Sequence, residues 1–121
     1  MSLIRMRRIA AGVALFFLVC PSRLYGHAIL LSAKPAAKQV IPGPDVTIQL
    51  RFNLRIDGKR SRITLIAPDG GQTSLAVLDQ DSPSVLSSGA KGLKRGSYIL
   101  RWQVLANDGH ITRGELPFQV E

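Results

Sequence analysis

Two histidines are the only imidazole side chains in this 121-residue chain, and both stand where a metal ion could be bound. His110 follows the turn sequence Asn107-Asp108-Gly109, and His27 follows an N-terminal leader-like segment. Asp108 and His110 are two positions apart, so on extended backbone their side chains project to one side. Imidazole and oxygen donors together suit Cu(II) or Ni(II), and Cu(II) stands highest in affinity for them.

The first 26 residues carry the pattern of an export signal. Met1–Arg8 is basic, Ile9–Cys20 is an unbroken apolar run, and Pro21 ends it. The run is shorter than the roughly 20 residues of a membrane-spanning helix, although a membrane anchor is the alternative interpretation. We therefore expect a cleaved signal peptide over residues 1–26, a single domain over residues 27–121 and a periplasmic protein.

Cleavage after Gly26 would make His27 a chelating N-terminus. Its α-amino nitrogen and its imidazole can bind one ion together, and the reference pKa of such an amine is only about 8. With Asp108 and His110, the donor set becomes three nitrogens and one oxygen. This set favours Cu(II), one ion per chain.

The expected mature chain contains no sulfur, because all three sulfur-containing residues precede the cut: Met1, Met6 and Cys20. It therefore offers neither a soft ligand for Cu(I) nor a disulfide, and its fold has to depend on a hydrophobic core. The net charge also falls, from +8 for the whole chain to +4 from the 12 basic and 8 acidic residues that remain. The basic residues that cluster over residues 51–62 have no aromatic residue for base stacking among them, since Phe52 belongs to the apolar face, so we expect no nucleic-acid partner.

The elements that must position these ligands have the pattern of strands. Apolar and polar residues alternate in Val46–Phe52, Tyr98–Val104 and Glu115–Glu121, as in half-buried antiparallel strands. Four further strands are expected over Ala28–Ser32, Arg62–Ala67, Thr73–Leu78 and Ser84–Ser88. About seven short strands with intervening Gly and Pro turns predict an all-β, Greek-key, immunoglobulin-like β-sandwich, with a small barrel as the alternative.

Two smaller features complete the pattern. Tyr98 and Trp102 are expected in the core, and Asp69-Gly70 is expected to turn a hairpin. Five basic residues cluster around one turn, where they form either a docking patch for an acidic partner or lipid head groups, or a solvated face. They are Arg51, Arg55, Lys59, Arg60 and Arg62.

Taken together, these residues resemble the CopC family of periplasmic copper-resistance proteins. The resemblance covers nearly all of residues 25–121. It rests on the opening His27-Ala28-Ile29-Leu30, on the strand Gly96–Val104, and on the ending that starts at Asn107-Asp108-Gly109-His110 and continues through Gly114 and Phe118-Gln119-Val120.

The resemblance implies a Greek-key β-sandwich with a Cu(II) site made by the amine and imidazole of His27, by Asp108 and by His110. It also implies a partner, a multi-span inner-membrane copper transport protein of the CopD type. We expect the copper-binding protein itself to be a monomer. Many members have a Met-rich Cu(I) site, but the corresponding stretch Leu65–Val77 has no methionine. Some members have a glutamate after the first long strand, where this chain has Phe52-Asn53-Leu54.

Three functions are compatible with these observations. The one we favour is copper binding for delivery, homeostasis or resistance, without enzyme activity. A histidine-brace copper oxygenase is an alternative, but a coordinating Asp108 would occupy the position that an oxygen substrate needs. The third is a metal-free β-sandwich that acts as an interaction module.

Overall fold

The computed structural model describes residues 27–121, and the export signal expected over residues 1–26 lies outside the described residues. Within residues 27–121, eight strands and one short 3-10 helix, η2 (Gly58–Arg60), follow each other. The strands are β1 (Leu30–Lys34), β2 (Val40–Ile41), β3 (Val46–Phe52), β4 (Arg62–Ile66), β5 (Gln72–Leu75), β6 (Val85–Ala90), β7 (Gly96–Leu105) and β8 (Ile111–Val120). Within residues 27–121, no helix is long and apolar enough to cross a membrane.

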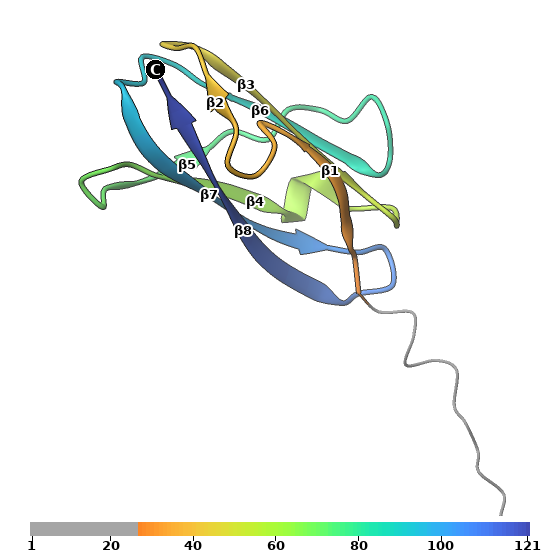
Figure 1. The fold of residues 1–121 in the computed structure, drawn as a ribbon. Coiled ribbons are helices and arrows are strands. Elements are labelled where there is room, and N and C mark those ends of the chain that lie inside the picture. The colour runs from red at the N-terminus through yellow and green to blue at the C-terminus, as the bar shows by residue number, and fades with distance from the viewer. Residues whose placement is uncertain (1–26) are drawn as a thin grey trace, which may run out of the picture.

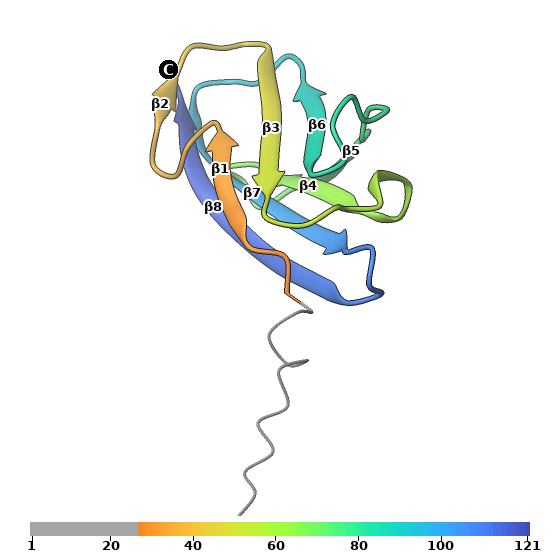
Figure 2. The ribbon, with the colours of Figure 1, turned by 90° about the vertical axis from the view of Figure 1, so that its right-hand side faces the viewer.

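The strands form two sheets that pack face to face (Figure 1 and Figure 2). The three-stranded sheet has the order β1-β3-β6, and the five-stranded sheet has the order β2-β8-β7-β4-β5. All strand pairs are antiparallel except β2 with β8, which is parallel. The immunoglobulin-like sandwich is confirmed and the barrel is wrong, because the two sheets are separate.

The alternating sequences place their apolar residues between the sheets. In β3, Ile48, Leu50 and Phe52 are almost completely buried, while the intervening Thr47 and Arg51 are exposed. Burying each such side chain contributes about 1.5–3 kcal/mol relative to leaving it in water. This hydrophobic core stabilises a domain in which residues 27–121 contain no cysteine for a disulfide.

The aromatic residues of β7 belong to this core, as predicted. The ring of Trp102 meets Phe52 edge to face, with ring centroids 6.4 Å apart, and Tyr98 stacks on Phe118 at 5.6 Å. The hydroxyl of Tyr98 donates a hydrogen bond to the carbonyl of Lys94 (2.8 Å), so the buried phenol is not left unpaired.

The two longest strands, β7 and β8, form the hairpin that carries the C-terminal histidine. They pair from Gly96 with Val120 to Leu105 with Ile111. The turn is closed by the N–H of Ala106, which donates to the carbonyl of His110 (2.9 Å), and by Gly109, whose φ of 94° favours glycine. This hairpin fixes residues 106–110 at one end of the sandwich.

Candidate metal centre

The fold brings together the two histidines that lie far apart in the sequence. The described chain starts beside the turn between β7 and β8, at the same end of the sandwich (Figure 2). The ring centroids of His27 and His110 are 6.4 Å apart, and the ring planes are tilted by 49°. Two imidazoles on opposite sides of one ion have centroids about 6 Å apart, given metal–nitrogen bonds of about 2 Å and about 1 Å from each nitrogen to its ring centre. The spacing thus fits one shared metal ion.

Asp108 contacts His110 directly. Its Oδ1 accepts a hydrogen bond from the backbone N–H of His110 (3.1 Å) and lies 3.3 Å from the Nδ1 of the same residue. The backbone hydrogen bond is the main reason why the pKa of the Asp108 carboxyl lies below its usual value. A carboxylate oxygen and a ring nitrogen at this distance can bind the same ion side by side, since two donors about 2 Å from one metal and at right angles to each other are about 3 Å apart. The lowered pKa keeps Asp108 ionised at neutral pH, and its carboxylate lies beside the His110 ring.

Two residues that the sequence analysis did not single out hold the segment that carries His27. The N–H of Ala28 donates to Thr112 Oγ1 (3.3 Å), and the Ala28 side chain is buried. The N–H of Ile29 donates to Asn53 Oδ1 (2.7 Å), and the N–H of Asn53 donates back to the carbonyl of Ile29 (3.1 Å). The backbone next to His27 is thus tied to β8 on one side and to the end of β3 on the other.

Only a weak sequence signal pointed to these two residues. Asn53 was visible as a departure from the glutamate-containing stretch of some family members, but its bond to Ile29 depends on how β1 pairs with β3. Thr112 is the second residue of β8, and no feature of the sequence marks it as a contact of the N-terminal segment. Its hydrogen bond to Ala28 forms only because the segment before β1 lies between β8 of one sheet and the end of β3 of the other.

No group of three or more His, Cys, Asp or Glu side chains within residues 27–121 is arranged to hold a metal ion. This includes the three expected side-chain donors, His27, Asp108 and His110, which the structure does not arrange as a three-residue site. The fourth expected donor is a main-chain amine. That amine exists only if the chain is cut before His27, since otherwise this nitrogen belongs to a peptide bond. The geometry of the described residues therefore brings two imidazoles together and places a carboxylate against one of them.

Comparison with known proteins gives matches in both sequence and structure. The CopC domain model matches residues 30–121, a range that contains Asp108 and His110 and begins three residues after His27. The structure of CopC from Methylosinus trichosporium OB3b is 31% identical, with a TM-score of 0.74 over 78% of this chain and 94% of that one.

Two Escherichia coli proteins are also similar to this chain. The structure of PcoC, a methionine-rich copper resistance protein, is 25% identical with a TM-score of 0.64, over 78% of this chain and 99% of that one. Protein YobA of strain K12 is 28% identical over 120 residues, which cover 97% of this chain and 96% of that protein. The domain model and these solved structures therefore indicate the same family.

Proposed function

The chain belongs to the CopC family, and on this basis we propose that it is an exported protein that binds one Cu(II) ion. The donors are the α-amine and imidazole of His27, the carboxylate of Asp108 and the imidazole of His110. Membership of the CopC family supports a copper-related function, and we assign the three residues as its ligands from their chemistry and position. We propose that the protein acts in the periplasm after removal of residues 1–26.

One observation carries this assignment. His27 and His110 are the only two histidines of the chain, they are separated by 82 residues, and their rings are 6.4 Å apart. The core does not require this arrangement, because both side chains are exposed. An exposed pair of imidazoles at metal-sharing distance, beside an ionised carboxylate, is a suitable site for a divalent copper ion.

We propose that this site is selective for Cu(II) over Cu(I). Cu(I) prefers thiolate and thioether ligands, and residues 27–121 contain neither Cys nor Met. The relative PcoC is described as methionine-rich, so the two proteins differ in this respect. Reducing the copper-loaded protein with ascorbate should release the metal to a Cu(I)-specific bathocuproine chelator. Retention of copper under these conditions would contradict the selectivity.

The role that follows is reversible copper carriage rather than catalysis. A carboxylate, two imidazoles and an amine would fill the four strong positions of a tetragonal Cu(II) site, so none of these would remain for an oxygen substrate. We propose that the protein is a monomer and hands its copper to a multi-span inner-membrane transport protein. Ascorbate-driven oxidation of polysaccharide by the copper-loaded protein would instead favour the oxygenase alternative.

The decisive experiment concerns the N-terminal amine. The Cu(II) affinity of a chain that begins at His27 should be compared, by chelator competition, with that of a chain that begins at Arg23. The longer chain keeps all side-chain donors but moves the amine four residues away. Loss of residues that merely support a metal ligand typically weakens binding by about 10–100-fold, so loss of a ligand should cost at least about tenfold. Equal affinities would remove the amine from the site.

A further inference from the structure

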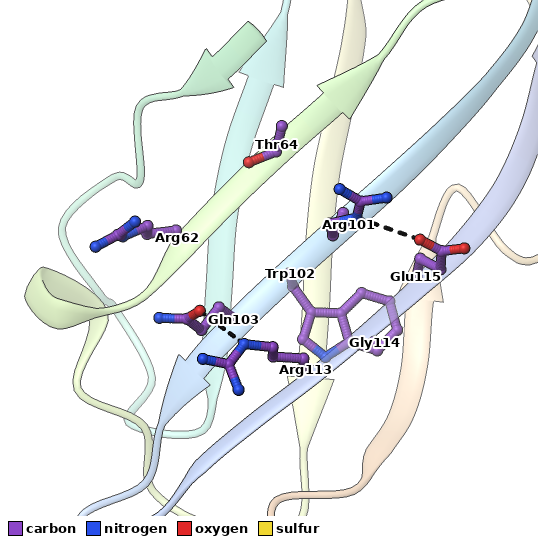
Figure 3. Close-up of a pocket in the computed structure, with 8 residues that line it drawn as sticks. All are labelled: Arg62, Thr64, Arg101, Trp102, Gln103, Arg113, Gly114 and Glu115. Carbon is purple, nitrogen blue, oxygen red and sulfur yellow. Dashed lines mark hydrogen bonds and ion pairs between the residues drawn. The ribbon is translucent and has the colours of Figure 1, made fainter. Parts of the chain in front are cut away.

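A hollow of about 500 Å³ lies on the outer face of the five-stranded sheet (Figure 3). It is open to solvent and lies over β4, β7 and β8, so it is distinct from the copper site. Three arginines from three different strands surround it, one on each strand: Arg62, Arg101 and Arg113. The other residues that line it are Thr64, Trp102, Gln103, Gly114 and Glu115.

The sheet register brings these arginines together. Arg62 pairs with Gln103, and Gln103 pairs with Arg113, which makes one row across the three strands. The next row is Thr64, Arg101 and Glu115. Side chains directly opposite each other are about 5 Å apart, and diagonal neighbours about 7–8 Å. The two rows therefore hold three positive charges and one negative charge within a small area.

Two of the guanidinium groups are oriented by their neighbours. Arg113 donates from Nε to Gln103 Oε1 (2.9 Å), and Arg101 donates from Nε to Glu115 Oε2 (3.2 Å). Each of these bonds uses Nε, which leaves the terminal NH2 groups to donate to a further acceptor. Within residues 27–121, neither Arg62 nor Arg113 forms an ion pair. The hollow therefore has a net positive charge that the described residues do not neutralise.

The hollow and the copper site lie on one continuous strip of surface. Arg113 follows His110 by three residues along β8, which corresponds to about 10 Å of extended chain. The residue between them on the outer face is Ile111, which is 48% exposed and pairs with Leu105. A partner that covers this strip would contact the arginines, an exposed apolar residue and the copper loop together.

We propose that the hollow is a docking surface for an acidic peptide segment of the protein that exchanges copper with this chain. The proposal rests on the proposed function for the identity of the exchange partner, but not for the binding of the acidic segment. Glutamate and aspartate side chains of the segment pair with the guanidinium groups of Arg62, Arg101 and Arg113. Docking there brings the rest of the partner to the loop that carries His110.

An acidic protein segment fits this surface better than other anions do. A small anion in an open hollow leaves most of its own surface in water, whereas small-ligand sites bury most of the ligand. Single-stranded nucleic acid is typically bound by exposed aromatic rings that stack on the bases, and the one indole of this chain, Trp102, is buried. A row of charges that provides long-range attraction suits a transient protein complex that has to form and separate quickly.

The test is an NMR titration of the chain that begins at His27 with a synthetic peptide of alternating glutamate and serine. The backbone signals of β4, β7 and β8 and the side-chain N–H signals of the three arginines should shift. The matching peptide with glutamine in place of glutamate should have no effect. The double variant Arg62→Gln/Arg113→Gln should bind the acidic peptide at least about fivefold more weakly, with the largest difference at low salt.

The matched control removes the same two charges from the other sheet. Lys34 and Arg51 are exposed on β1 and β3, so Lys34→Gln/Arg51→Gln has the same net charge as the hollow variant. It should bind the peptide like the unmodified chain. Equal weakening in both variants would show non-specific attraction and overturn the proposal. Equally tight binding of citrate, or of phosphatidylglycerol vesicles, with the same dependence on Arg62 and Arg113 would also overturn it in favour of a small anion or a membrane.

The copper function is measured separately on the same samples. The hollow variant should retain the Cu(II) affinity of the unmodified chain, because neither arginine is a copper donor. A chain that binds Cu(II) but not the acidic peptide would overturn only the docking surface. A chain that binds the peptide but not Cu(II) would overturn the proposed function and leave the acidic-segment site standing.

Discussion

At the scale of single residues, the copper site depends on how firmly a chain terminus is held. A free N-terminus samples many conformations, and fixing one residue costs about 1–2 kcal/mol of conformational entropy. Here Ala28 and Ile29 are already held by bonds to Thr112 and Asn53 before copper arrives. Because the backbone that follows His27 is already fixed, binding of copper to His27 costs less conformational entropy than it would at a free chain end.

This argument gives Asn53 a measurable effect on copper affinity. Removing its side chain in Asn53→Ala deletes the bond to the Ile29 N–H, and a typical hydrogen bond is worth about 0.5–1.5 kcal/mol. We expect Cu(II) affinity to fall by about two- to tenfold in chelator competition while the domain stays folded. The control is Thr47→Ala, which removes an exposed polar side chain from β3 at a distance from the copper loop. Equal affinities of the two variants would show that the Asn53 contact does not position His27.

At the scale of elements, the β7–β8 hairpin connects the core to the copper loop. Its two strands are ten residues long each, and they pair from Gly96 with Val120 to Leu105 with Ile111, next to the turn at residues 106–110. Trp102 of β7 fits against Gly114 of β8, where any side chain would collide with the indole. A Cβ atom built at Gly114 would overlap the Cζ2 atom of Trp102.

Gly114→Ala should therefore destabilise the domain. The indole is 8% exposed and packs on Phe52, so it has little room to move, and overpacking a core costs about 1–3 kcal/mol. The matched control is Gly89→Ala on β6, where the nearest atom to the added Cβ is 3.7 Å away. Urea denaturation monitored by circular dichroism should show a lower midpoint for Gly114→Ala alone. A midpoint unchanged in both variants would mean that the indole can shift without cost.

At the scale of the whole molecule, the copper site links two parts of the chain that the folded state alone brings together. His27 belongs to the segment before β1, and His110 to the last hairpin. An ion that binds only this folded arrangement stabilises it by mass action, by an amount that grows with the ratio of free copper to Kd. Copper should therefore raise the melting temperature of the whole domain.

Differential scanning calorimetry with and without excess Cu(II) checks this expectation. At a free copper concentration of 100 Kd, the stabilisation is about 2.7 kcal/mol. His110→Ala should show almost the same melting temperature as the unmodified chain without copper, because its side chain is exposed and surface changes typically cost less than about 0.5 kcal/mol. Its copper-induced shift should be much smaller. An equal shift in both proteins would remove His110 from the site.

The sequence alone determined most of the fold. The alternation in Val46–Phe52 predicted β3 to the residue, and the same pattern located β7, β8 and their buried faces. Asp69-Gly70 does turn the β4–β5 hairpin, with Gly70 at a φ of 89°. These features are local, since period-two patterning and turn chemistry depend only on neighbouring residues. The two-residue strand β2 was missed, because two residues are too few to show a period.

The tertiary structure alone decided which distant residues meet. The basic cluster Arg51–Arg62 divides between the two sheets, so Arg51 lies on β3 and Arg62 joins Arg101 and Arg113 on the opposite sheet. The sequence could name His27 and His110 as candidate ligands, but the 6.4 Å between their rings depends on how residues 27–29 lie against β8 and the end of β3. Such contacts are set by strand register and sheet packing. A slip of one residue in the register of a strand would move its side chains to the other face of the sheet, and no local pattern in the chain specifies contacts of this kind.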